Sequence, residues 1–202
     1  MIEESNLKAL LESGLAKSMS YKDYRDMVAK LVEENGTTGV NSTQDLVAYT
    51  KMNNSRMKRW DKTLKLSEDA VSKIVKNTKT MTWLVLTESW CGDAAHIMPV
   101  LHKVAEQNDN IDFKVVLRDE NTALIDAFLT NGGRSIPKLI VIDNTTNTVI
   151  DTFGPRPSTA AQMAIAYKNE HGQLTPEFKE DLQRWYNKDK GQTVVTDVLR
   201  LF

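Results

Sequence analysis

The sequence predicts an α/β protein with a mixed four-stranded sheet, flanking helices, and helical extensions at both the N- and C-terminal ends. In the middle of the chain, runs of β-branched and aromatic residues alternate with helical segments. Before and after this middle zone, apolar residues repeat at three- and four-residue spacing. A polar turn joins the last two strand-like runs, so we expect a hairpin beside a parallel pair of strands.

The first 78 residues have only helical patterns. Ser20 and Ser67 are candidate N-caps because each precedes a helical apolar pattern and is followed by acidic residues. Asn35-Gly36 ends the second pattern, and a polar loop follows it. The expected helices cover residues 7–15, 21–32 and 44–64, and a fourth starts at residue 68.

The middle zone predicts the order β-α-β-α-β-β-α. Its strands and helices are separated by turn residues, among them Asn131-Gly132-Gly133 and the Asn144–Asn147 turn. The expected strands cover 81–87, 111–117, 138–142 and 148–153, and the expected helices cover 92–107, 122–129 and 158–168.

The last zone is helical again. Thr175-Pro176-Glu177 is a strong helix start, and residues 194–202 fit a short final helix or, because of their β-branching, a strand. We expect an N-terminal helical extension over 1–67 packed on a core of 68–170, with C-terminal helices over 171–202. Trp60 and Trp185 lie on apolar stripes and should be buried against the core.

Composition excludes several classes of function. The 202 residues carry a net charge of -1, which gives no basic field for nucleic acid or an anionic membrane. No apolar run is long enough to span a bilayer, and the N-terminus lacks the pattern of a secretory signal. One cysteine cannot form an internal disulfide, so we expect a cytoplasmic protein. We expect no cofactor, and the oligomeric state does not follow from the sequence.

The single cysteine, Cys91, lies where the first strand meets the first helix of the middle zone. On the first turn of a helix, free N–H groups and the helix dipole favour a thiolate over a thiol. Asp93 opposes this, because a carboxylate two residues away favours the protonated thiol. Three residues on, where a second cysteine would complete C-x-x-C, the chain has Ala94.

Residues 68–170 resemble the thioredoxin superfamily at four points. Trp90-Cys91-Gly92 matches the start of its active-site loop, and Pro99 matches the proline of its active-site helix. Leu117–Asn121 lies where the second core strand ends, and Ile136-Pro137 matches the cis-proline signature. With W-C-G-D-A-A in place of C-x-x-C, the chain is similar to a bacterial thioredoxin-like branch. The resemblance implies a thioredoxin fold.

The resemblance also implies the site and its limits. Cys91 would be the nucleophile, and substrate would contact the side chains and backbone around it: Trp90, Gly92, Asp93, Arg134, Ile136 and Pro137. Asp93 replaces the usual proline, Ala94 replaces the resolving cysteine, and Val85 stands where the family has a buried carboxylate. Dithiol reduction is therefore not expected.

The remaining chemistry-bearing residues predict no second site. His96 and His102 are six apart on one helix and face away from each other, so they suit exposed or semi-buried positions and not a metal site. Lys58 and Arg59 fit a solvated helix face.

The expected function is monothiol thiol–disulfide exchange at Cys91. A mixed disulfide there would be resolved by an external thiol, so the partners would be protein disulfides or low-molecular-weight thiols. The main alternative is a non-catalytic protein-binding module with a degenerate site, in which the cis-proline groove and Trp90 hold a protein segment. A one-cysteine peroxidase is a weaker third interpretation.

Overall fold

A mixed four-stranded sheet in the order β2-β1-β3-β4 lies at the centre of the fold, in a computed structural model that describes residues 4–201. β1 pairs parallel with β2 and antiparallel with β3, and β3 pairs antiparallel with β4. This is the parallel pair and hairpin that the sequence predicts. The strands are β1 (Met81–Thr87), β2 (Ile111–Leu117), β3 (Lys138–Asp143) and β4 (Thr148–Phe153).

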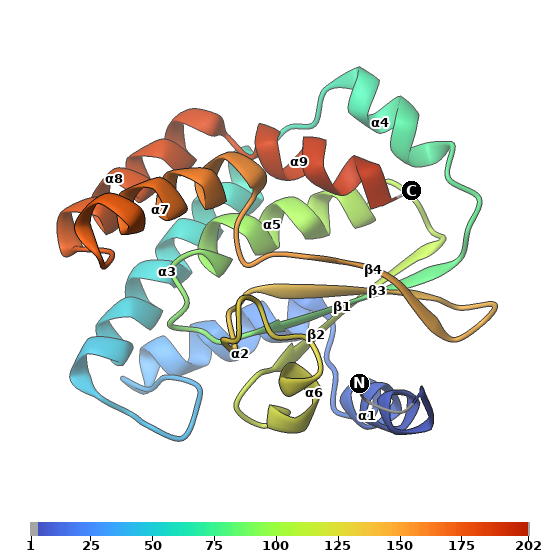
Figure 1. Ribbon diagram of the computed structural model, residues 1–202, viewed down its shortest axis with the longest axis horizontal. Coiled ribbons are helices and arrows are strands. Elements are labelled where there is room, and N and C mark those ends of the chain that lie inside the picture. Colours follow the sequence, from blue (N-terminus) through green and yellow to red (C-terminus); the bar gives the residue numbers. More distant parts are fainter. Residues whose placement is uncertain (1–3, 202) are drawn as a thin grey trace.

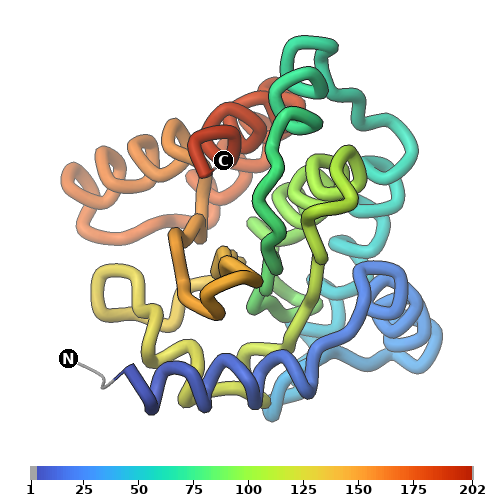
Figure 2. Tube along the Cα trace, turned by 90° about the vertical axis from the view of Figure 1, so that its right-hand side faces the viewer, coloured from blue at the N-terminus to red at the C-terminus, as the bar shows by residue number. Residues whose placement is uncertain are grey.

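The helices cover both faces of this sheet (Figure 1). α1 and α6 lie on one face, and α5, α7 and α9 lie on the other (Figure 1). In the view at right angles, α1 crosses beneath the sheet, on the side opposite to the C-terminal helices (Figure 2). The helices are α1 (Glu4–Ala16), α2 (Tyr21–Glu33), α3 (Gln44–Thr63), α4 (Glu68–Val75), α5 (Ala94–Ala105), α6 (Thr122–Asp126), α7 (Ser158–His171), α8 (Pro176–Asp189) and α9 (Gln192–Val198).

Local sequence signals explain where these helices begin. The side chains of Ser20, Thr43, Ser67 and Thr175 each accept a hydrogen bond from a backbone N–H in the first turn. Such caps satisfy N–H groups that have no partner within the helix. After α9 the chain forms a 3-10 turn over Leu199–Leu201, so the last segment is helical and not a strand. Phe202, which we included in the final helix, lies outside the described residues.

The N-terminal helices are joined to the sheet. Met19, between α1 and α2, exchanges two backbone hydrogen bonds with Val115 at the outer edge of β2, at N···O distances of 2.8 and 2.9 Å. Side chains of these helices are buried in the same core as the strands, including Leu11, Tyr24 and Trp60. Trp185 packs against the core but keeps part of its surface exposed, so it is less buried than we expected.

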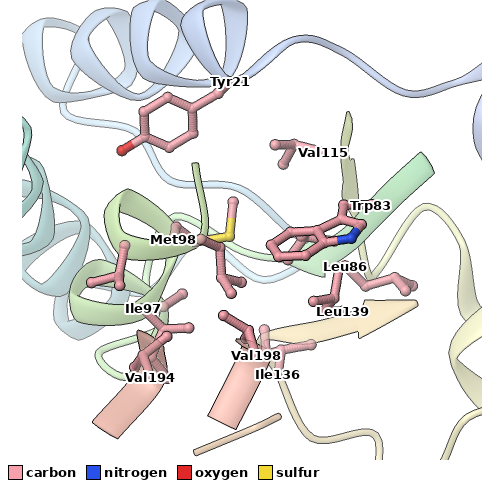
Figure 3. Packing of buried hydrophobic residues seen from close by; sticks show 14 of the residues in the cluster. Tyr21, Trp83, Leu86, Ile97, Met98, Val115, Ile136, Leu139, Val194 and Val198 are labelled. Atoms are coloured by element: carbon pink, nitrogen blue, oxygen red, sulfur yellow. The ribbon is translucent and has the colours of Figure 1, made fainter. Parts of the chain in front are cut away.

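The core lies mainly between the sheet and α5. All seven residues of β1 are buried, because β1 is a central strand with helices over both faces. In Figure 3, Ile97 of α5 lies beside Val194 of α9, and Met98 lies toward Trp83 of β1. The C-terminal helices therefore share one hydrophobic core with the sheet and hold α5 in place over it.

Candidate functional site

Cys91 lies in the turn that connects β1 to α5. Its backbone N–H donates to the carbonyl of Glu88 at 3.1 Å, and its carbonyl accepts from Ala95 at 3.3 Å. α5 begins at Ala94, two residues later than expected, so Cys91 precedes the helix instead of lying on its first turn. The N–H groups of Asp93 and Ala94 still hydrogen-bond the sulfur and lower its pKa, as helix N-termini do.

The Ile136–Pro137 peptide bond is cis and lies against this thiol. Cys91 Sγ donates to the carbonyl oxygen of Ile136 at 3.3 Å. Ile136 and Pro137 are both buried. The carbonyl that a substrate strand would use is therefore already bonded to the cysteine.

Two effects hold Cys91 in its protonated form. Burial is the larger, because the residue is only 8% exposed, and the negative charge of Asp93 adds to it. Together they raise the pKa of the thiol to about 12, despite the N–H groups and the cation of Arg156, which act in the opposite direction. We expected the helix N-terminus to favour a thiolate, but desolvation raises the pKa by more than the N–H groups lower it.

Asp93 is fixed by two partners from the C-terminal third of the chain. Arg156 Nη2 lies 2.9 Å from one carboxylate oxygen, and the Tyr186 hydroxyl donates to the other at 2.9 Å. Burial raises the pKa of this carboxyl group, and both partners lower it. The side chain of Asp93 is 12% exposed, so this is a nearly buried ion pair.

His96 occupies the next turn of α5 and is only 2% exposed. Trp60 Nε1 donates to His96 Nδ1 at 3.0 Å, so the proton is on Nε2, which faces Gln183 Oε1 at 2.7 Å. The ring stacks on Tyr186 at a centroid distance of 4.6 Å. Burial lowers the pKa of His96 to about 4. The expectation of an exposed or semi-buried histidine was wrong, because three distant side chains enclose it.

Trp90 and Arg134 are placed differently from each other. Trp90 is half-buried beside the thiol turn, with the guanidinium of Arg118 5.0 Å from its ring centroid. Arg134 is exposed, and two of its nitrogens each lie 2.6 Å from a carboxylate oxygen of Asp126. The cation beside Cys91 is Arg156 instead, which the sequence analysis did not select.

α3 and α8 close over the turn that carries Cys91. Asn53 Nδ2 on α3 donates to the carbonyl of Ser89 at 3.0 Å. A Cβ added at Gly92 would lie 3.9 Å from both Arg56 Nη1 and Gln183 Nε2. The helical extensions therefore contact the Cys91 turn, which carries part of the substrate site that the resemblance implied, whereas Arg134 stays exposed. These partners are 36 to 93 positions away in sequence, so no local pattern indicates them.

A buried hydroxyl cluster fixes the start of the same turn. Ser89 Oγ lies 2.8 Å from the hydroxyl of Thr50, and its backbone N–H donates to Thr38 Oγ1 at 2.8 Å. Glu88 accepts from the N–H of Asp119 at 2.8 Å, and burial raises its pKa. The start of the turn is thus held by several internal hydrogen bonds.

The outer face of α3, in contrast to the buried Cys91 turn, carries large side chains that are exposed. Tyr49 and Met52 are each 43% exposed, and Arg56 continues the same stripe one turn further on. Arg56 Nη1 donates to Asn53 Oδ1 at 3.0 Å. Within residues 4–201, no carboxylate lies within 4.0 Å of Arg56 to pair with it. We call Tyr49, Met52 and Arg56 the α3 stripe.

The described part of the chain contains no group of three or more His, Cys, Asp or Glu side chains that could hold a metal ion. Among the same residues, no helix is both long and apolar enough to cross a membrane.

Comparison with known proteins agrees with the fold. A solved Pseudomonas aeruginosa protein of unknown function is similar at 15% identity and a TM-score of 0.62, covering 99% of this chain and 96% of that one. A solved HIV epitope scaffold is similar at 15% identity and a TM-score of 0.57, covering 90% and 96%. No curated protein matches the chain.

A family model described as thioredoxin matches residues 39–169. The match begins inside the segment that we expected to be an N-terminal extension, so it takes in α3 and α4. It also covers Cys91, Pro137 and all four strands, which is more than half of the chain. The chain therefore belongs to the thioredoxin family.

Proposed function

We propose that this protein is a non-catalytic thioredoxin-fold module that binds a peptide segment of another protein on the α3 stripe. The observation that carries the non-catalytic part is the enclosed thiol. Cys91 is 8% exposed, its pKa is raised to about 12, and its hydrogen goes to a buried carbonyl. At neutral pH it is therefore a thiol, which is not a nucleophile.

The α3 stripe supports binding, because tyrosine, methionine and arginine are enriched at protein interfaces. Tyr49 and Met52 offer exposed apolar surface at i, i+3 spacing. Arg56 is half-buried and has no carboxylate partner within the described chain. A partner segment with an apolar side chain next to an acidic one would cover the apolar surface of Tyr49 and Met52 and give Arg56 a carboxylate. The stripe ends against Gly92, so the partner would lie beside the thiol turn without reaching the sulfur.

Alkylation of native protein by iodoacetamide across pH 6 to 11 tests the non-catalytic part. At pH 7 Cys91 should react at least about 100-fold more slowly than a free cysteine, whose pKa is about 8.5. The rate should still be rising at pH 11. A rate that reaches its plateau near pH 7 would overturn the proposal.

Selection from a displayed random peptide library tests the binding part. Selected peptides should place an aromatic or aliphatic residue next to Asp or Glu. Their affinity should fall about tenfold for Arg56→Gln, since a charge-assisted hydrogen bond is lost. Lys58→Gln is the matched control, because Lys58 is an exposed cation on the opposite side of the same helix. Peptides that bind both variants equally would contradict the α3 stripe as the site.

Monothiol exchange is the second candidate, supported by the N–H groups of Asp93 and Ala94 at the sulfur. It requires the Cys91–Ile136 contact to open, so that a disulfide can reach Sγ. Incubation with oxidised glutathione followed by mass spectrometry distinguishes the two functions. A glutathione adduct on the wild type that is absent from Cys91→Ser would favour exchange, whereas no adduct would favour the binding module.

A further inference from the structure

A cavity of about 480 Å³ lies where the C-terminal half of α3 meets the turn between α8 and α9. Trp60 of α3 and Leu64, the residue that follows α3, supply its apolar wall. The volume is in the range of small-molecule sites. None of its lining residues belongs to the α3 stripe or to the Cys91 turn, although Arg59 is one turn beyond Arg56 on the same helix.

The charge of this cavity has one sign. Arg59, Lys65 and Lys190 all line it, and no acidic side chain does. Across residues 4–201, none of these three cations has a carboxylate within 4.0 Å. Like charges that share a small site repel each other, so their positions favour a bound anion.

Two acidic residues that neighbour the cavity in sequence are engaged elsewhere. Asp61, next to Trp60, accepts from Arg25 at 3.0 Å and from Tyr21 at 2.7 Å. Asp189, next to Lys190, accepts from the N–H and the hydroxyl of Thr193. Neither carboxylate is free to neutralise the cavity.

Two parts of the cavity wall, Arg59 and the α8–α9 turn, are held by contacts within the protein. Arg59 donates to Asn187 Oδ1 at 2.5 Å, and its guanidinium lies 5.6 Å from the ring centroid of Trp60. Lys190 and Gly191 both have positive φ, and a Cβ on Gly191 would lie 2.7 Å from a methyl of Val100. The α8–α9 turn is therefore packed tightly against α5, which limits the movement of the wall.

We infer that this cavity binds the phosphate group of a small molecule. Three cations without a carboxylate partner carry more positive charge than one carboxylate would neutralise, and they match a group with about two negative charges and three acceptor oxygens. Trp60 and Leu64 leave room beside the charges for an apolar body, so the ligand is a phosphate ester or free phosphate. This binding is independent of the peptide binding proposed for the α3 stripe.

Titration calorimetry with three probes tests the inference: phenyl phosphate, inorganic phosphate and benzyl alcohol. Phenyl phosphate should bind with a stoichiometry of one, and benzyl alcohol should give no heat. Tighter binding of phenyl phosphate than of inorganic phosphate identifies an ester as the ligand, and equal binding identifies free phosphate. Either result supports a phosphate site. No binding of either phosphate at millimolar concentration would overturn the inference.

Variants assign the binding to this cavity. Lys65→Gln and Lys190→Asn should each lower the affinity for phenyl phosphate about tenfold, because each removes a charged donor. Asn is chosen at position 190 because it tolerates the left-handed conformation there, and circular dichroism should show both variants folded. Lys8→Gln on the exposed surface of α1 is the matched control and should bind as the wild type does. Equal affinity in all three variants would place the phosphate elsewhere and contradict the inference.

Discussion

The Cys91 turn and the α3 stripe lie next to each other, but they differ in how far their side chains are bonded within the protein. Around Cys91, the thiol, Asp93 and His96 each have a partner inside the protein. On the α3 stripe, Arg56 has no carboxylate partner in the described chain, and Tyr49 and Met52 keep 43% of their surface exposed. A charged group without an ionic partner and exposed apolar surface can both contribute to the free energy of binding another protein. The residues typical of catalysis are thus held by internal contacts, whereas side chains on the α3 stripe keep exposed surface and a cation without a carboxylate.

The largest expected effect comes from breaking the buried ion pair of the Cys91 turn. Asp93→Asn should lower the free energy of unfolding by about 3 kcal/mol, because it leaves Arg156 without its carboxylate. It should also lower the pKa of Cys91, since the charge of Asp93 raises it. Urea denaturation and the alkylation rate measure these two effects. Asp26→Ala, at an exposed ion pair on α2, should leave the midpoint unchanged. A loss below about 1 kcal/mol would mean that the turn is less buried than its contacts indicate.

Acid should destabilise the same region through His96. Folding lowers the pKa of His96 from about 6.5 to about 4, so the unfolded state binds more protons below pH 6.5. Stability is therefore lost as the pH falls from about 6.5 toward 4, and His96 alone should contribute about 2.5 kcal/mol of loss by pH 4.5. We would measure the free energy of unfolding by urea denaturation at pH 7 and at pH 4.5. The loss between these two pH values should be about 2.5 kcal/mol smaller for His96→Gln than for the wild type. His171→Gln, at an exposed histidine, should retain the dependence of the wild type.

A smaller effect is expected at the thiol itself. Cys91→Ser should cost about 1 kcal/mol of unfolding free energy, because a buried hydroxyl replaces a sulfur that is hydrogen-bonded to Ile136. The affinity for a selected peptide should not change. If peptide binding were lost while the protein stayed folded, the thiol would belong to the binding site and the contrast between the two regions would fail.

The smallest effect on stability is expected on the α3 stripe. Met52→Ser should change the unfolding free energy by no more than about 0.5 kcal/mol, because Met52 is largely exposed. The same substitution should lower the affinity for the selected peptide, because the apolar contact is lost. Peptide binding that is unaffected by Met52→Ser would restrict the proposed surface to the neighbourhood of Arg56.

Much of the fold could be predicted because its signals are local. The caps at Ser20, Ser67 and Thr175 were identified from the sequence and make the expected hydrogen bonds. β1 has the expected bounds, since an apolar β-branched run with a change of period at each end is typical of a central strand. The α6 helix ends at Asp126, three residues earlier than expected, because short helices have weak boundaries.

By itself, the sequence determined the order of elements, the single thiol between the first strand and the helix that follows it, and the absence of a resolving cysteine at Ala94. Only the tertiary structure decided what that thiol can do. The pKa of Cys91 depends on its burial and on Asp93, which Arg156 and Tyr186 hold from far along the chain. Burial and long-range hydrogen bonds arise when distant segments pack together, so a local motif can indicate a thiol site while its environment keeps the thiol protonated.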